Sequence, residues 1–340
     1  MADQKNKRPF CAGVQQGELD IMKVERSSLR QSPLVIASPF WAILVALTCL
    51  GLSSSTALAQ KSKTPEKQVA LAQKSKTPEK QVEDFDPNKF DRSTQIDNAW
   101  MPLKPGTRLV YAGIAIDNDK PVPRRLVVTV TDLTKVIGGI RTVISWDLDY
   151  NAGELVEAEL AFYAQDKDGT VWLMGEYPED YDKGKFVSAP TWLHGLEEAR
   201  AGIAMPAKPQ LGTPSYSQGW GPAVNWTDRG QVDQMGKATC VPMGCYKDVL
   251  VIAETSKAET NAHQLKYWAR GVGNVRVGWR GKGEKTKETL ELVDIIQLGP
   301  EALAEVRAKA LELEKHAYEM SKNVYSHTSP AEHTPGAHGK

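Results

Sequence analysis

Apolar and polar residues alternate along residues 107–177, and this pattern is the clearest structural signal in the chain. A period of two is typical of strands whose side chains point to opposite faces of a sheet. Short breaks rich in Gly, Asn and Asp, such as Gly138-Gly139, separate the alternating runs and are typical of tight turns. Strands joined by such short turns pair antiparallel, because a parallel connection needs a dozen or more residues. The pattern predicts five antiparallel strands, at residues 107–116, 124–133, 140–150, 154–165 and 170–177.

The alternation stops after this meander and returns near residue 238. Residues 178–221 hold several Pro, two of them in the segment 202–209. Pro is confined to the edges of sheets because it lacks an N–H donor, so we expect a loop-rich middle. Five further strands are predicted at residues 238–241, 246–254, 263–269, 274–279 and 288–298. The predicted fold class is mainly β: an antiparallel curved sheet or barrel of about ten strands over residues 85–298, with a C-terminal amphipathic α-helix.

The helix is predicted over residues 299–325, where apolar residues recur at spacings of three and four. Pro300 at the first helical position and Glu301 in the first turn are typical of a helix start. Such a stripe packs either against a partner helix or on a sheet, and the apolar face of the predicted sheet needs a cover. We therefore expect the helix to pack on the β domain through Leu303, Val306, Ala310, Leu313, Ala317, Met320 and Val324.

The N-terminal part of the chain has the features of an export signal. Arg30 precedes an apolar run, and Ala-Leu-Ala at 57–59 has the small-x-small pattern that signal peptidases accept. Residues 1–59 are therefore predicted to be a signal region, in which residues 1–21 are either a long n-region or a wrongly assigned start. An uncleaved membrane anchor is the alternative, but the uninterrupted run is short for a span of about 20 residues. We expect a mature chain that begins at Gln60, has no membrane span, and is periplasmic or extracellular.

Two polar segments flank the predicted domain. Residues 58–69 recur letter for letter at 71–82, and their Lys, Gln, Pro and Thr cannot bury apolar surface. Residues 60–84 are accordingly predicted to be a disordered Lys-rich linker. The repeat also copies the Ala-Leu-Ala pattern, which predicts a minor mature form that begins at Gln73. Residues 326–340, rich in His and Pro, are predicted to be a disordered tail.

Charge and motifs exclude several functional classes. The chain has 42 basic and 42 acidic residues, but residues 83–340 hold 30 basic and 36 acidic ones. A mildly acidic body lacks the basic face that nucleic-acid binding needs. The sequence contains no phosphate-cradling Gly loop, no dinucleotide fingerprint and no H-E-x-x-H motif. We expect a monomer with no cofactor and no metal site.

Cysteine usage predicts one disulfide. Cys11 and Cys49 fall in the signal region, which leaves Cys240 and Cys245 around Val241-Pro-Met-Gly. Half of a metal site is the alternative, but no second Cys pair and no nearby His completes it. In an exported protein the oxidising compartment favours a disulfide between Cys240 and Cys245.

Aromatic residues are the candidate ligand-binding residues. Trp, Tyr and Phe in β proteins mostly fill the core, but a cluster of them can also line a ligand cavity. On the second interpretation the candidates are Trp146, Tyr163, Trp172 and Trp268. No catalytic residue is assigned, because neither His194 nor His263 stands in a nucleophile motif. A hydrolase with dispersed residues such as His194, Asp147 and Glu157 remains an alternative.

Four motifs, at residues 97–106, 162–172, 202–209 and 271–275, together resemble a family of exported, functionally uncharacterised bacterial proteins. The closing hairpin is similar to a larger group of secreted β proteins with a curved, lipocalin-like or lipoprotein-carrier-like sheet. The resemblance implies export and a β fold, and it supplies no activity. The leading hypothesis is a non-enzymatic envelope protein that binds a small or apolar ligand in the concavity of the sheet. The alternatives are a protein-interaction module that uses the C-terminal helix or the Pro-rich middle, and the hydrolase.

Overall fold

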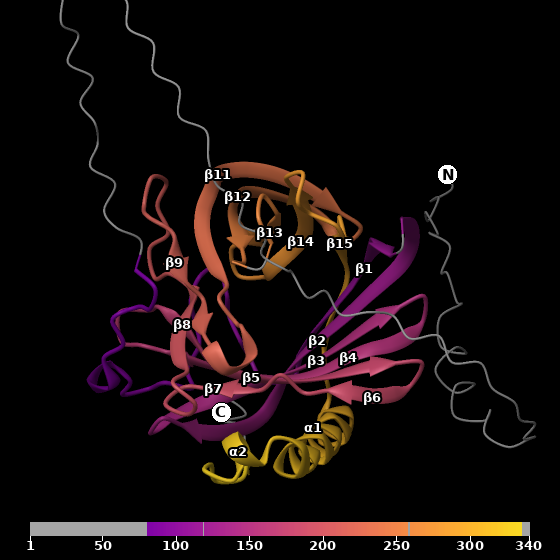
Figure 1. The fold of residues 1–340 in the computed structure, drawn as a ribbon. Coiled ribbons are helices and arrows are strands. Elements are labelled where there is room, and N and C mark those ends of the chain that lie inside the picture. Colours follow the sequence, from indigo (N-terminus) through magenta and orange to yellow (C-terminus); the bar gives the residue numbers. More distant parts are fainter. Residues whose placement is uncertain (1–79, 118, 258, 335–340) are drawn as a thin grey trace, which may run out of the picture. The chain divides into compact units, whose positions relative to one another are not determined.

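The computed structural model describes residues 80–117, 119–257 and 259–334. The predicted signal region, both predicted mature N-termini, most of the predicted linker and the last six residues lie outside this part of the chain. The described residues form one large antiparallel sheet, with helices on one side of it (Figure 1).

The sheet contains sixteen strands in the described residues. They are β1 (Thr107–Asp117), β2 (Lys120–Ile137), β3 (Ile140–Asn151), β4 (Glu154–Gln165), β5 (Val171–Asp182), β6 (Lys185–Ser188), β7 (Trp192–Leu193), β8 (Arg200–Met205), β9 (Tyr216–Ser217), β10 (Gly219–Trp220), β11 (Arg229–Val241), β12 (Gly244–Thr255), β13 (His263–Ala269), β14 (Gly273–Arg280), β15 (Thr289–Gln297) and β16 (Glu332–His333). The helical elements are the 3₁₀ turns η1 (Pro87–Lys89) and η2 (Pro222–Val224), and the α-helices α1 (Pro300–Met320) and α2 (Lys322–Tyr325).

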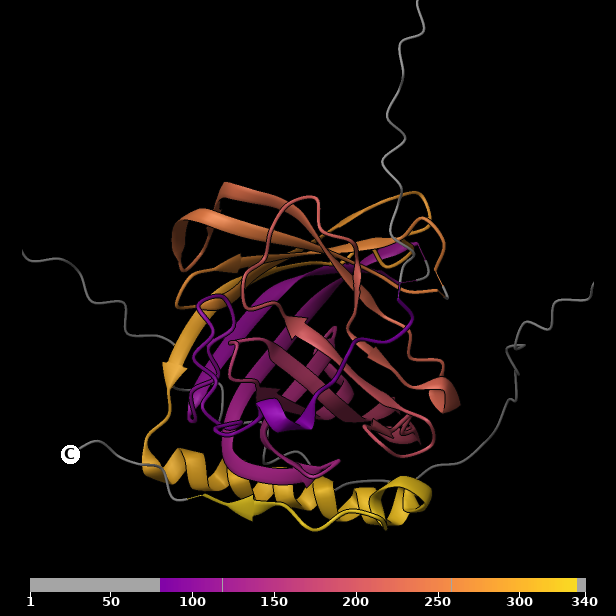
Figure 2. The same ribbon diagram turned by 90° about the vertical axis from the view of Figure 1, so that its left-hand side faces the viewer.

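The order of the strands curls the sheet into a nearly closed barrel. Hydrogen-bonded neighbours follow the order β10-β8-β5-β4-β3-β2-β1-β15-β14-β13-β12-β11-β9, with β6 and β7 added to β5 and β16 added to β2. The strands β9 and β10 stand at opposite ends of this order, yet only Gln218 separates them along the chain. The two edges of the sheet therefore meet, and β11–β14 curve over β2–β5 (Figures 1 and 2).

The predicted fold class is confirmed, whereas the predicted number of about ten strands is too low. All ten predicted strands are present, and the six others are β6–β10, in the segment predicted to be loop-rich, and β16. Strands of two to six residues are too short to show alternation. The strand β8 lies between β5 and β10 and ends at Met205, so Pro206 and Pro209 follow it instead of interrupting it.

The C-terminal helix covers the outer face of β2–β5 (Figure 1). Five residues of the predicted stripe are buried in α1, namely Leu303, Val306, Ala310, Leu313 and Ala317. Met320 is instead 44% exposed. The reason is a break at Ser321, whose hydroxyl lies 2.5 Å from Thr191 Oγ1 and where α1 ends before α2 begins. The chain direction changes there, and Val324 and Tyr325 of α2 return to the core.

Residues 326–334, predicted to belong to a disordered tail, are bound to the sheet and to α1. In β16, Glu332 and His333 pair with Thr134 and Leu133 of β2. The backbone N–H of Ala331 donates to the carboxylate of Glu314 at 3.0 Å. Amino-acid composition did not predict this order, because the segment is held by backbone pairing and buried polar contacts, neither of which requires apolar residues.

One end of the barrel interior is filled by the irregular segment before β1. Trp100 and Met101 pack there with Val143, Val171 and other buried residues. The Asn98 side chain fixes the segment, because it accepts the backbone N–H of Trp100 at 2.8 Å and donates to the carbonyl of Gly169 at 2.8 Å. Part of the remaining interior is a cavity.

The predicted disulfide is present. Cys240 and Cys245 face each other across the hairpin of β11 and β12, and their sulfur atoms are bonded. Both residues are exposed, so the bond closes a surface hairpin and adds little to the core.

We expect the Cys240→Ser variant to fold but to melt about 4–8 °C below the wild type. Closing so short a loop stabilises by about 2 kcal/mol through the entropy of the unfolded chain, and each kcal/mol shifts the melting temperature by about 2–4 °C in a domain of this size. Thermal unfolding followed by circular dichroism measures this. As a control, a reductant should lower the melting temperature of the wild type and leave that of the variant unchanged. Equal melting temperatures for wild type and variant would contradict the expectation.

Candidate functional site

The open part of the barrel interior forms a cavity of about 500 Å³. A second cavity of about 240 Å³ adjoins it and shares wall residues such as Tyr163, Glu176 and Trp268. Sites for small molecules in proteins are typically concave and about 300–1,000 Å³ in volume. The interior is therefore the candidate functional site.

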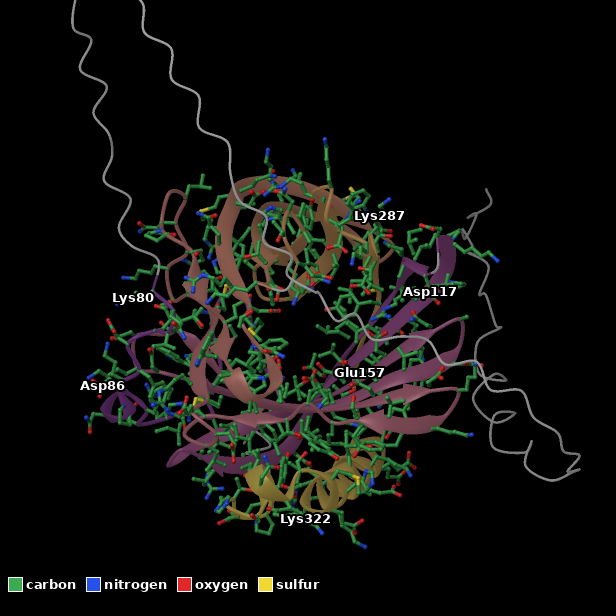
Figure 3. The ribbon with its side chains drawn as sticks, viewed as in Figure 1. Lys80, Asp86, Asp117, Glu157, Lys287 and Lys322 are labelled. Atoms are coloured by element: carbon green, nitrogen blue, oxygen red, sulfur yellow. A yellow bond between two sulfur atoms is a disulfide. The ribbon has the colours of Figure 1, made fainter. Side chains whose placement is uncertain are left out.

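Strand alternation decides which residues reach this cavity. In β3, Asp147 and Asp149 point into the barrel, whereas Trp146 and Leu148 pack on the outer side near α1. In β4, Glu157, Glu159 and Tyr163 point inward, because they pair with Asp149, Asp147 and Val143 of β3. Figure 3 shows Glu157 on the side of the sheet that faces β13 and β14, away from the helices.

One wall of the cavity is apolar. It is formed by the neighbouring strands β1, β2, β14 and β15, and the segment before β1 adds Met101 and Leu103. Pairing continues across this wall, since Leu109 faces Val128 and Tyr111 faces Leu126. The apolar side chains on these strands are Leu109, Tyr111, Leu126, Val128, Val277 and Leu290.

The opposite wall is acidic and comes from β3, β4 and β5. Asp147 lies directly opposite Glu159, and Asp149 lies directly opposite Glu157. Glu176 of β5 pairs with Ala161, which is two residues beyond Glu159 on β4. Like charges that face each other across a strand pair destabilise a sheet, so this arrangement is costly for the fold.

Some of the interior carboxylates have partners. Arg124 pairs with Asp149, and its Nε lies 2.7 Å from Glu288 Oε1. Lys266 Nζ lies 2.7 Å from Glu254 Oε2, and Trp192 Nε1 donates to Glu176 at 2.9 Å. These two basic residues stand among eight carboxylates on the walls of the two cavities, which are Asp147, Asp149, Glu157, Glu159, Glu176, Asp228, Glu254 and Glu288.

Burial and crowding raise the pKa of these acids. Burial is the main cause, and it raises the pKa of Asp147 to about 7 and that of Glu157 to about 7. The pKa of Glu176 rises to about 8 for the same reason, against a lowering by the hydrogen bond from Trp192. Burial and the nearby Glu176 also raise the pKa of Glu159 well above its usual value. Part of the acidic wall therefore carries protons at neutral pH.

The structure brings together two of the four predicted ligand-binding residues. Tyr163 and Trp268 line the cavity from β4 and β13. Trp146 lies on the outer face, and Trp172 packs in the core between the sheet and α1, with its Nε1 donating to Asp166 at 3.0 Å. Of the four, Tyr163 and Trp268 can therefore contact a molecule in the barrel interior.

The acidic wall was not among the predicted ligand-binding residues, although Asp147 and Glu157 were named for the hydrolase alternative. The signal was present: Asp147 and Asp149, and Glu157 and Glu159, are spaced by two residues on consecutive predicted strands. That spacing places each pair on one face of a sheet. A short hairpin between the strands brings the two pairs together.

The residues of the hydrolase alternative do not form one site. His194 lies beside Phe85 and accepts the backbone N–H of Ala201 through Nδ1 at 3.0 Å. Asp147 and Glu157 face the barrel interior, and His194 is not on the wall of that cavity. Burial lowers the pKa of His194.

A separate groove of about 500 Å³ runs between α1 and the outer face of β3–β5. Trp146, Leu148 and Leu313 form its apolar part. At its edge, His316 Nδ1 lies 2.5 Å from Glu179 Oε1, and the buried Glu179 also accepts from the hydroxyl groups of Tyr177 and Tyr181.

Two further properties concern the part of the chain that the structure describes. No group of three or more His, Cys, Asp or Glu side chains is arranged there to hold a metal ion. In the same residues, no helix is both long enough and apolar enough to cross a membrane.

Comparison with known proteins gives two structural matches. No model of a protein family matches the chain, and no curated protein does. A protein from Bacteroides fragilis, assigned as exported and with a YmcC-like fold, is 11% identical, with a TM-score of 0.32, over 58% of this chain and 99% of its own. A protein from Parabacteroides distasonis, assigned as a lipoprotein, is 13% identical, with a TM-score of 0.33, over 59% of this chain and 100% of its own. Similarity at this level carries no conclusion about the fold, location or activity of this chain.

Proposed function

We propose that this chain is an exported protein of the cell envelope that binds a small, largely apolar molecule inside the barrel. The cavity of about 500 Å³ with one apolar wall carries the proposal. Residues that fill a protein core normally pack without voids of this size, so an open interior is retained for an occupant. The export signal predicted at residues 1–59 supports the location.

The wall residues suit such an occupant. Tyr163 and Trp268 offer flat apolar surfaces on the wall of the cavity, and Leu126 and Leu290 lie on the apolar wall. An apolar ligand gains about 25 cal/mol for each Å² that it removes from water. The binding free energy would therefore come mainly from this wall.

The interaction-module alternative has less support from the packing of α1. Its apolar stripe, including Leu303 and Leu313, is already buried against the sheet. The exposed apolar residues of α1 are Leu311 and Met320, which do not continue that stripe. A partner would find no continuous apolar surface on this helix.

The test is a titration of the full chain with N-phenyl-1-naphthylamine, a neutral apolar fluorophore. We expect saturable binding at one site. The Leu126→Trp variant places a larger side chain in the cavity and should weaken binding by about tenfold or more, which is about 1.4 kcal/mol. A Val187→Trp variant is the matched control, because Val187 of β6 is 60% exposed and distant from the cavity wall.

Two results would contradict the proposal. The first is the absence of saturable fluorescence with the wild type. The second is equal affinity in the wild type and in Leu126→Trp, with the variant shown to be folded by its circular dichroism spectrum.

A further inference from the structure

The acidic wall contains more carboxylate groups than the fold provides with partners. In the described part of the chain, the side chains of Glu157 and Glu159 make no hydrogen bond or ion pair. Both face the cavity, opposite Asp149 and Asp147 of the next strand. Their burial with like-charged neighbours destabilises the sheet. Features that break a rule of folding without a structural gain are expected at functional sites.

A second observation indicates that a polar group of a ligand belongs in this cavity. Trp268 is only 9% exposed and lies on the wall of both interior cavities. Its indole N–H has no hydrogen-bond partner among the described residues. One carboxylate oxygen of Asp149, which is also 9% exposed, is without a partner as well. An unpaired buried polar group costs about 1–3 kcal/mol, and a ligand that carries polar atoms would remove this cost.

The two walls of the cavity differ in polarity. The apolar strands β1, β2, β14 and β15 face the acidic strands β3, β4 and β5 across one cavity. The basic residues that could neutralise the acids, Arg124 and Lys266, are already paired with Asp149, Glu288 and Glu254. Glu157 and Glu159 therefore form no ion pair with a basic side chain in the described part of the chain.

We propose that the ligand is an organic cation with an apolar body, whose protonated amine is held by Glu157, Glu159 and Asp147. The apolar body lies against Leu126, Val128 and Leu290. This inference rests on the proposed function and adds the charge of the ligand to it. A hydrogen-bond acceptor in the ligand would meet the indole N–H of Trp268.

The raised pKa values support this assignment. Burial is the main cause that raises the pKa of Asp147 and that of Glu157 to about 7. A bound ammonium group stabilises the ionised form of a carboxyl group, so binding releases protons. Other charged groups surround these two acids. Asp149 on β3, Glu159 on β4, Asp180 and Glu176 on β5, Arg124 on β2, Lys266 on β13 and Glu288 before β15 come from the neighbouring elements, and Glu254 on β12 and Asp228 before β11 line the adjoining cavity.

The test is a competition between three molecules that share a ten-carbon chain. Decylammonium, decanol and decanoate each displace N-phenyl-1-naphthylamine from the full-length protein. We expect decylammonium to compete at a concentration about tenfold or more below that of decanol, and decanoate to be the weakest. The ratio of the decanol concentration to the decylammonium concentration measures the preference for a cation. A variant that weakens the binding of decanol and decylammonium equally leaves that ratio unchanged.

The acidic wall is tested with Glu157→Gln/Glu159→Gln, in which the preference for decylammonium should fall by about tenfold. The matched control is Glu154→Gln/Glu301→Gln, which removes the same charge from two exposed positions outside the cavity. In this control the preference should equal that of the wild type.

The pH dependence gives an independent readout. An alkylammonium group with a pKa near that of Lys, about 10.4, stays protonated between pH 6 and 8. The carboxyl groups ionise over the same interval, so the affinity for decylammonium should rise with pH in the wild type. A cation bound through its apolar chain alone would show a flat profile.

The outcomes separate the two proposals. Absence of N-phenyl-1-naphthylamine binding overturns the proposed function. Binding of the fluorophore with equal competition by the amine, the alcohol and the acid overturns only the cationic ligand. Displacement by calcium ions but not by decylammonium would also overturn it, since the acidic wall would then be a metal site.

Discussion

The Leu313→Asp variant should aggregate or remain unfolded. Leu313 is 9% exposed and packs in the core between α1 and the outer face of the sheet. Loss of its buried apolar surface costs about 1.5–3 kcal/mol, and an unpaired polar group in the same place adds several more. The total rivals the whole net stability of a typical domain, about 5–15 kcal/mol. Size-exclusion chromatography and circular dichroism of the purified variant measure the outcome.

The helix itself supplies the control for this experiment. Leu311 is two positions away on α1, is 37% exposed and points away from the core. The free energy of unfolding of the Leu311→Asp variant should therefore lie within about 0.5 kcal/mol of that of the wild type, as is usual for surface substitutions. Should Leu313→Asp, or a chain truncated before Pro300, stay soluble with an unchanged melting temperature, α1 would not be part of the core. The interaction-module hypothesis would then become the leading one.

The Lys135→Met variant should lose about 3–5 kcal/mol of stability, the usual cost of leaving one partner of a buried ion pair alone. Lys135 is fully buried, and its Nζ lies 2.8 Å from Glu314 Oε1 and donates to the carbonyl of Ser329 at 2.6 Å. The same ammonium group lies 4.9 Å from the ring centroid of Tyr325. One side chain of β2 thus holds α1, α2 and the C-terminal segment together.

Urea denaturation of matched variants separates charge from packing. The Lys135→Met/Glu314→Gln variant removes both charges and keeps an acceptor for the backbone N–H of Ala331. It should recover most of the stability lost in Lys135→Met, because replacing a whole buried ion pair by neutral groups is often harmless. If the free energy of unfolding of Lys135→Met lies within about 1 kcal/mol of that of the wild type, the ion pair does not hold the helix to the sheet.

The meander of β1–β5 could be predicted because its signals are local. Alternation within each strand and Gly or Asn in each turn need no knowledge of distant residues, and predicted and observed ends differ by a few residues, the most at β5, which continues to Asp182. The short strands β6–β10 carry no such signal, since their pairing partners and not their own residues define them. The break at Ser321 was also missed, because it depends on a contact with Thr191.

A ligand site in the concavity of the sheet stays a prediction, and two of its four predicted residues, Tyr163 and Trp268, lie on the cavity wall. Hairpin register alone separates Tyr163 from Trp146: Tyr163 pairs with Val143, so it shares a face with Asp147 and not with Trp146. The sequence does not reveal which of the two faces α1 covers, because both carry apolar residues at their ends. That choice is made by packing between elements more than 100 positions apart in the sequence.

The pairing of β1 with β15 has a consequence for how fast this protein folds. Thr107 and Gln297 are partners although 190 positions separate them. This pairing cannot form until β15 has been synthesised, and folding rates fall steeply when contacts are this distant in sequence. Until then β1 presents an unpaired edge, a template for contact with other chains. We therefore expect slow folding and a period of vulnerability to aggregation, during which a molecular chaperone would have the most effect on yield.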